Sequence, residues 1–203
     1  RIPVGIHYTL TCDWKYLRWG PLTNAPSLTT ADGSFPSTVE AVQATARHEE
    51  VITELSAQTD RLLATGLTIT HQDCHMAPIS IAAYDEMTKR YGKRSRVAKI
   101  PGAFPFTSII SLSAHDAAVK KRWLLDQLAA LKPGVHVLVC HCAHPGAEMA
   151  SVNPADAPSR WAEEYRASDL AVILDPDIRA EINRLGIRLC TTVDAEFSAS
   201  AHS

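Results

Sequence analysis

The chain has 203 residues, of which 46% are hydrophobic and 21% are charged, a globular composition that excludes a disordered protein. Twenty basic against 22 acidic residues leave a net charge of −2, so no broad basic surface points to nucleic acid. No apolar run reaches the roughly 18–20 residues of a membrane span, and the 5 cysteines are irregularly spaced, unlike a secreted disulfide framework. We therefore expect a cytoplasmic protein with no membrane or nucleic-acid partner.

Predicted strands and helices alternate along the first half of the chain. In chain order we expect a strand over 4–10, a long loop over 11–37, a helix over 38–65, a strand over 67–70 and a helix over 78–91. Loops as long as the one over 11–37 are usually functional in compact domains.

The same alternation continues in the second half. Ser113 and Asp116 resemble a capping box that opens a helix. Beyond that helix we expect a strand over 135–142, helices over 158–170 and 176–185, and a last strand over 186–190. Residues 93–112 carry only weak signals. Alternating strands and helices predict parallel strands with crossovers, as a barrel or as an open doubly wound sheet.

A histidine-rich segment, His71-Gln72-Asp73-Cys74-His75, follows the strand predicted over 67–70. Ligands of α/β folds bind at the carboxyl ends of strands. Two imidazoles with a carboxylate between them can supply nitrogen ligands and an orienting oxygen for a divalent metal ion. The alternative is a polar loop whose histidines bond to backbone. Likewise, His7 in the first strand is either a core histidine or a third nitrogen ligand.

A second cluster ends the strand predicted over 135–142. Cys140 and Cys142 are interpreted as buried free cysteines, since the paired motifs of structural zinc sites are missing from the sequence. His144 precedes Pro145-Gly146 in the next loop, and an imidazole that titrates near neutrality suits general acid or base catalysis. Aromatic residues could line a sugar cleft or pack within loops: Trp14, Tyr16, Trp19 and Trp161.

Four segments together resemble the YdjC-like carbohydrate deacetylases. They are the 4–10 strand, the 70–75 motif, His144-Pro145-Gly146 and the closing 166–189 stretch, in the family's order over nearly all the chain. The resemblance implies a distorted TIM-like (β/α) barrel with residues 1–203 as a single catalytic domain. It also implies a hydrolase that removes acetyl groups from N-acetylated sugars or oligosaccharides.

The resemblance further implies a role for each site residue. One divalent metal ion, Mg or Zn, is held by His7, His75 and an Asp. His144 matches the His-Pro-Gly histidine and would protonate the departing amine. His71, Asp73 and Arg166 would position the substrate or the metal ligands.

The family's opening strand has no match here. That strand carries an Asp-Asp pair, one Asp for the metal and one as base, and only six residues precede His7. Asp13, in the following loop, is no motif match. We therefore expect a longer chain that begins before Arg1. The alternatives are a non-catalytic carbohydrate-binding homologue and a metal-dependent hydrolase of another amide or ester. The oligomeric state stays open, because an exposed barrel face could pair with a second copy.

Overall fold

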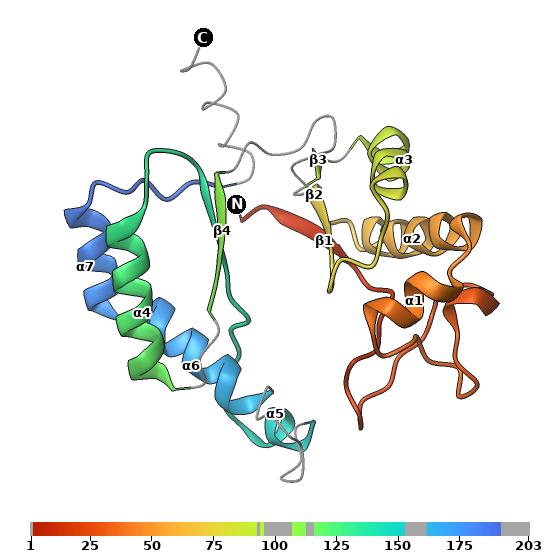
Figure 1. The fold of residues 1–203 in the computed structure, drawn as a ribbon, viewed down its shortest axis with the longest axis horizontal. Helices are drawn as coiled ribbons and strands as arrows, with labels where there is room; N and C mark the ends of the chain where they lie inside the picture. The colour runs from red at the N-terminus through yellow and green to blue at the C-terminus, as the bar shows by residue number, and fades with distance from the viewer. Residues whose placement is uncertain (1, 93, 96–106, 113–115, 153–161, 192–203) are drawn as a thin grey trace. The chain divides into compact units, whose positions relative to one another are not determined.

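A computed structural model describes residues 2–92, 94–95, 107–112, 116–152 and 162–191 (Figure 1). The chain divides into two compact units, Arg1–Pro105 with Thr191–Ser203, and Phe106–Cys190. The single catalytic domain over residues 1–203 stays a prediction. Among the described residues, no helix is long and apolar enough to cross a membrane.

The first unit contains a parallel three-stranded sheet in the order β1-β2-β3. Its elements are β1 (Val4–Tyr8), the short 3-10 helix η1 (Pro26–Leu28), α1 (Val39–Thr45), α2 (His48–Leu63), β2 (Ile69–Cys74), α3 (Ile81–Tyr91) and β3 (Arg94–Ser95). Helix α3 ends at Tyr91 and is capped by Gly92, which has the left-handed φ of 64° expected of a glycine at the end of a helix. Parallel strands joined by helices confirm the α/β prediction for this unit.

The core of the first unit lies between the sheet and helices α2 and α3. Strand β1 sends Ile6 and Tyr8 into it, where they join Leu55 of α2 and Met87 of α3. Because side chains alternate along a strand, His7 between them points out of the core, with 54% of its side chain exposed. The alternative of a core histidine is therefore wrong.

Two features of this unit differ from the sequence predictions. The helix predicted over 38–65 is divided into α1 and α2, because the Arg47 backbone N–H bonds to Ser27 Oγ (3.0 Å) instead of continuing the helical ladder. The segment predicted as a loop after residue 70 is instead the second half of β2, paired with β1 up to Cys74.

The second unit has a parallel pair of strands covered by helices. Its elements are β4 (Ser108–Ser111), α4 (Ala117–Ala130), β5 (His136–Val139), α5 (Ala147–Ser151), α6 (Glu163–Leu174) and α7 (Pro176–Arg184). Leu124, Leu128, Val172 and Ile178 bring α4, α6 and α7 together in a core. The pairings among the described strands form these two parallel sheets, and the TIM-like barrel stays a prediction.

Two ends in this unit were predicted wrongly. Residues 186–190 form no strand, because the Gly186 and Ile187 amides bond back to carbonyls at the end of α7. Asp116 is itself the cap of α4, since its side chain accepts from the Val119 N–H (2.9 Å). Ser113, and residues 158–161 at the start of the helix predicted over 158–170, lie outside the described residues.

Candidate active site

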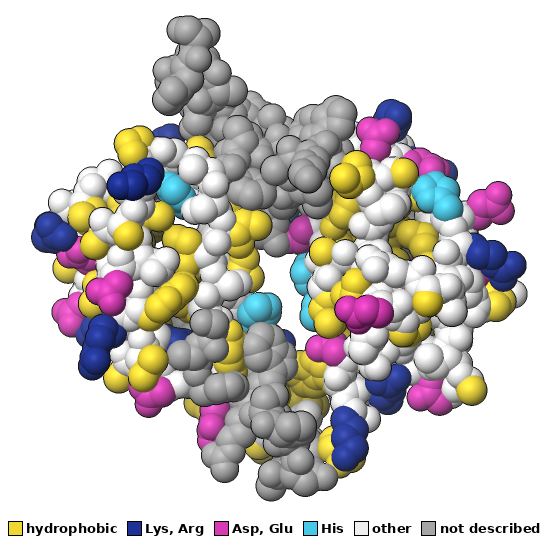
Figure 2. All heavy atoms as spheres, in the orientation of Figure 1, with side chains coloured by type: hydrophobic (Ala, Val, Ile, Leu, Met, Phe, Trp, Pro, Cys, Tyr) yellow, Lys and Arg dark blue, Asp and Glu magenta, His cyan; other side chains and the backbone are white. Residues whose placement is uncertain are grey.

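Two histidines and two carboxylates gather at the carboxyl ends of β1 and β2. His7 Nδ1 lies 2.6 Å from Asp73 Oδ1, and His75 Nε2 lies 3.1 Å from Asp13 Oδ1. The two imidazole rings lie with centroids 5.6 Å apart and planes at 72°. Histidine side chains reach the surface of this unit, coloured cyan in Figure 2. The group therefore forms one open cluster of nitrogen and oxygen donors.

The register of the parallel strands builds this cluster. His7 is paired with Asp73 across the sheet, and the His75 N–H donates to Tyr8 O (2.8 Å), which extends the pairing by one residue. Along β2 the side chains of alternate residues share a face, so His71 and Asp73 lie together while Gln72 is fully buried on the other face. Because His71 and Asp73 are two residues apart in the strand, their side chains lie on the same face of the sheet.

His71 occupies the next place on the same face and lies across Gly5. A Cβ atom on Gly5 would come within 3.0 Å of three His71 ring atoms. The His71 Nδ1 atom is 2.9 Å from Thr70 Oγ1. The imidazole can therefore occupy this place only because residue 5 has no side chain.

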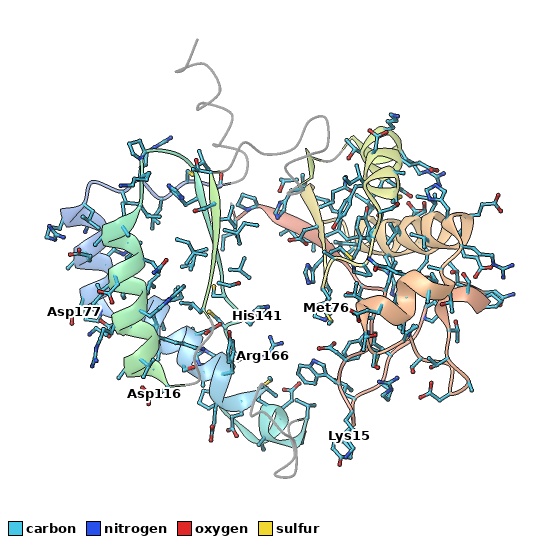
Figure 3. The ribbon with its side chains drawn as sticks, viewed as in Figure 1. Lys15, Met76, Asp116, His141, Arg166 and Asp177 are labelled. Atoms are coloured by element: carbon cyan, nitrogen blue, oxygen red, sulfur yellow. The ribbon has the colours of Figure 1, made fainter. Side chains whose placement is uncertain are left out.

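The chain turns sharply directly after His75. Met76 and Ala77 have φ angles of 52° and 53°, in the left-handed region that non-glycine residues rarely adopt. The Ala77 N–H donates to Cys74 O (3.3 Å), which closes the turn, and Met76 is exposed (Figure 3). Such backbone strain clusters at functional sites.

Asp13 is the site residue that the sequence reasoning set aside. It follows Cys12, whose N–H donates to Pro36 O (2.8 Å) and whose side chain lies in the core of the first unit, so the start of the loop is bonded to its end and fixed in place. That path is a tertiary feature. Its one trace in the sequence is that Asp13 is the first carboxylate after the end of β1.

The aromatic residues of this loop divide between packing and exposure. The Trp19 indole N–H donates to Thr11 O (2.9 Å), and the Trp14 and Trp19 rings meet edge to face at 6.3 Å. Tyr16 is 52% exposed. Packing therefore explains Trp19, whereas Trp161 lies outside the described residues.

His144 and Arg166 belong to the second unit. His144 is exposed in the segment between β5 and α5, and Arg166 lies on α6, where its backbone O accepts from the Ala143 N–H (3.3 Å).

Cys140 and Cys142 are free cysteines, but Cys142 is exposed, so its predicted burial is wrong. Burial and the neighbouring Cys142 raise the pKa of Cys140 to about 12.

Among the predicted site residues, the structure thus brings His7, His71, Asp73 and His75 together on one pair of strands, and it adds Asp13 to them.

The donor chemistry of the cluster fits a divalent metal ion. Imidazole nitrogen and carboxylate oxygen are the ligands that Zn accepts, and carboxylate oxygen suits Mg. In the described ranges, each histidine turns toward its own carboxylate, and no three His, Cys, Asp or Glu side chains form a group that could hold a metal ion.

Comparison with known proteins decides the family. A family model described as YdjC-like protein matches residues 1–184. The chain belongs to the YdjC-like family. A carbohydrate deacetylase from Geobacillus stearothermophilus is 29% identical over 195 residues, covering 93% of this chain and 74% of that protein. One from Thermus thermophilus is 30% identical over 188 residues, covering 81% and 70%.

A solved structure shares the fold of this YdjC-like chain. It is an Enterococcus faecalis V583 protein described as a cellobiose-phosphate cleavage protein, with a TM-score of 0.73 and 18% identity. The match covers 95% of this chain and 77% of that one. The α/β architecture is therefore common to both proteins.

Proposed function

We propose that this YdjC-like protein is a carbohydrate deacetylase that hydrolyses the acetamide of N-acetylated sugars. The observation that carries the proposal is the pairing of His7 and His75 at the ends of two parallel strands, each with a carboxylate. Two family members with about 30% identity over most of the chain bear the same name. The substrate class is therefore an acetylated sugar or oligosaccharide.

Within this proposal, His7 and His75 hold one divalent metal ion, Zn or Mg. When bound, the ion supplies Lewis-acid activation of the acetamide carbonyl and of water. Asp73 accepts the Nδ1 proton of His7, which fixes the tautomer of the ring and makes Nε2 its basic nitrogen. Asp13 likewise bonds Nε2 of His75, which makes Nδ1 the basic nitrogen of that ring. The two carboxylates thus orient the two proposed ligands.

His144 is proposed as the general acid. Amide hydrolysis requires a proton on the departing nitrogen, and a histidine is the side chain best suited to hold and release one near neutral pH. The role rests on the His-Pro-Gly motif and on the exposure of His144. His71, on the same face as Asp73, and Arg166 are proposed to position the substrate.

The finer architecture belongs to the same proposal. Parallel pairing in both sheets, with helices joining the strands, supports a distorted TIM-like barrel. The proposed site then lies where barrel enzymes place theirs, at the carboxyl ends of strands. A cytoplasmic location also stays a prediction.

Replacement of His75 tests the proposal directly. His75→Ala removes one of two imidazole ligands, so the purified variant should lose both bound metal and acetate release. Metal content after dialysis against Zn or Mg, and acetate released from N-acetylated chitooligosaccharide, are the two measurements. His48→Ala is the matched control, because His48 lies on α2 bonded to Glu86 and should change neither. A metal-free His75→Ala protein that still releases acetate would overturn the assignment.

His144→Ala should separate binding from catalysis. We expect normal metal content with a rate about 10²–10⁴-fold lower, because a general acid contributes that much without holding the metal. Unchanged turnover would remove His144 from the mechanism and leave the metal assignment standing.

A further inference from the structure

A fully buried ion pair joins α4 to α6 in the second unit. The side chains of Lys120 and Asp169 both have 0% exposure, and Lys120 Nζ donates to Asp169 Oδ1. Removing two charges from water carries a desolvation penalty that their attraction often fails to repay, and apolar residues of similar volume commonly replace such pairs without loss of stability. Core stability alone is therefore a weak reason for this pair.

The bonding of the pair points to the loop that carries the His-Pro-Gly motif. Lys120 Nζ also donates to Tyr165 O (2.9 Å) and lies 3.5 Å from the centroid of the Tyr165 ring. The other oxygen of Asp169, Oδ2, accepts from the backbone N–H of His141 (2.7 Å). The carboxylate thus bridges a buried ammonium and the backbone just beyond β5, in a charge-assisted hydrogen bond.

Helix α6 makes two further contacts with the same loop. Its Arg166 carbonyl accepts from the Ala143 N–H (3.3 Å), and Glu163 Oε1 accepts from the Gly146 N–H (3.2 Å). Residues three apart share one face of a helix, so a single face of α6 holds three amides between residues 141 and 146. Figure 3 shows Arg166 and His141 at this junction, and His144 lies between the second and third of these bonds.

We propose that α6 is a positioning helix for His144, and that the buried Lys120–Asp169 pair fixes the His141 amide at the start of the loop. This inference rests on the proposed role of His144 as general acid. An acid must stay within hydrogen-bonding reach of the atom it protonates, and a misplacement of about 1 Å can cost 10²-fold in rate. Lys120 and Asp169 act through the loop and are positioning residues.

Two double variants isolate the bond to His141. Replacing one partner alone would leave a buried charge, so both carry Lys120→Met. In the variant Lys120→Met with Asp169→Asn, the asparagine oxygen can still accept from the His141 N–H. In the variant Lys120→Met with Asp169→Leu, the leucine is branched at the same atom as asparagine but offers no acceptor. We expect the Asn form to retain kcat within about threefold and the Leu form to lose about 10–100-fold. KM and metal content should be equal in the two.

Amide hydrogen exchange at His141, measured by NMR, provides a readout that is independent of catalysis. The Leu form should exchange at least about tenfold faster than the Asn form, because exchange reports loss of the hydrogen bond. Equal exchange rates, or equal kcat in the two forms, would overturn the inference. If the wild-type protein releases no acetate, the proposed function fails, and the exchange rates still decide whether Asp169 holds the loop.

Variants of Glu163 test a second bond between α6 and the loop without changing a residue of the core. Glu163→Gln keeps an acceptor for the Gly146 N–H and Glu163→Ala does not. We expect kcat to fall at least about threefold in the Ala form relative to the Gln form, with KM unchanged. Should the buried double variants fail to fold, equal kcat in this second pair would overturn the inference.

Discussion

At Gly5 a missing side chain decides how the candidate site is built. The His71 imidazole lies across this residue on the face of the sheet that also carries His7 and Asp73. Any larger residue at position 5 would compete with the ring for the same space. The Gly-Ile-His sequence of β1 therefore supplies both a proposed metal ligand and the room for its neighbour.

Gly5→Ala should destabilise the protein and displace His71. Overpacking of this kind costs about 1–3 kcal/mol, because either the ring or the strand must move. Urea unfolding of the wild type, Gly5→Ala, His71→Ala and the double variant measures it. Since His71→Ala opens the space, the double variant should be less destabilised than the sum of the two single variants. Strict additivity would show that the two residues do not meet.

The contact between Asp13 and His75 could not be predicted from the sequence. His7, Asp73 and His75 were predicted from a strand and a motif, and the strand register brings them together. Asp13 reaches His75 only because the loop after β1 bends back beside it, and no pattern in the sequence encodes that path. The metal-binding role of His7 and His75 stays a prediction.

At the scale of elements, α2 holds the long loop between β1 and α1. Three of its side chains, one helical turn apart, face that segment. Glu50 accepts from the Ser27 N–H and hydroxyl, and Glu54 accepts from the Leu22 and Thr23 N–H groups. The side-chain amide of Gln58 accepts from the Thr9 N–H and donates to the Thr9 carbonyl oxygen. The N–H donor from Ser27 is the main reason that the pKa of Glu50 is lowered. The loop that carries Asp13 is thus fixed from one helix.

Glu54→Ala should weaken this anchor. Glu54 is fully buried and accepts from two backbone amides and the Thr23 hydroxyl, so its removal leaves these three donors without their acceptor and empties the space that its side chain fills. We expect a loss of about 2–4 kcal/mol in the free energy of unfolding, measured with urea. Glu49→Ala, exposed on the same helix, should stay within about 0.5 kcal/mol of wild type. Equal effects of the two changes would refute the anchoring role.

The elements that the sequence predicted well are those with strong local signals. The helix predicted over 78–91 is α3 (Ile81–Tyr91), and the helix predicted over 176–185 is α7 (Pro176–Arg184). The predictions failed where tertiary contacts decide. The bond from the Arg47 N–H to Ser27 Oγ separates α1 from α2. Pairing with β1 makes residues 71–74 part of a strand, although their polar side chains are typical of a loop. Neither contact is visible in the local sequence.

At the scale of the whole molecule, two parallel α/β sheets each end in a segment that carries histidines. In one unit these are His7 and His75, with Asp13 and Asp73, and in the other His144 lies in the loop after β5, whose backbone amides bond to α6. The amino-acid sequence predicted the parallel α/β class and the family, and the comparisons confirm the family. Barrel closure depends on contacts between distant strands, which periodicity does not encode.

Acetate release by the full chain is the decisive measurement for metal-dependent deacetylation. Protein stripped with a chelator is assayed on N-acetylated chitooligosaccharide before and after Zn or Mg is restored. We expect no acetate from the stripped protein, and equal amounts of acetate and free amine once metal is returned, because His7 and His75 are proposed to act through that ion. Saccharide binding without acetate at any metal concentration would contradict it and would identify a non-catalytic carbohydrate-binding protein.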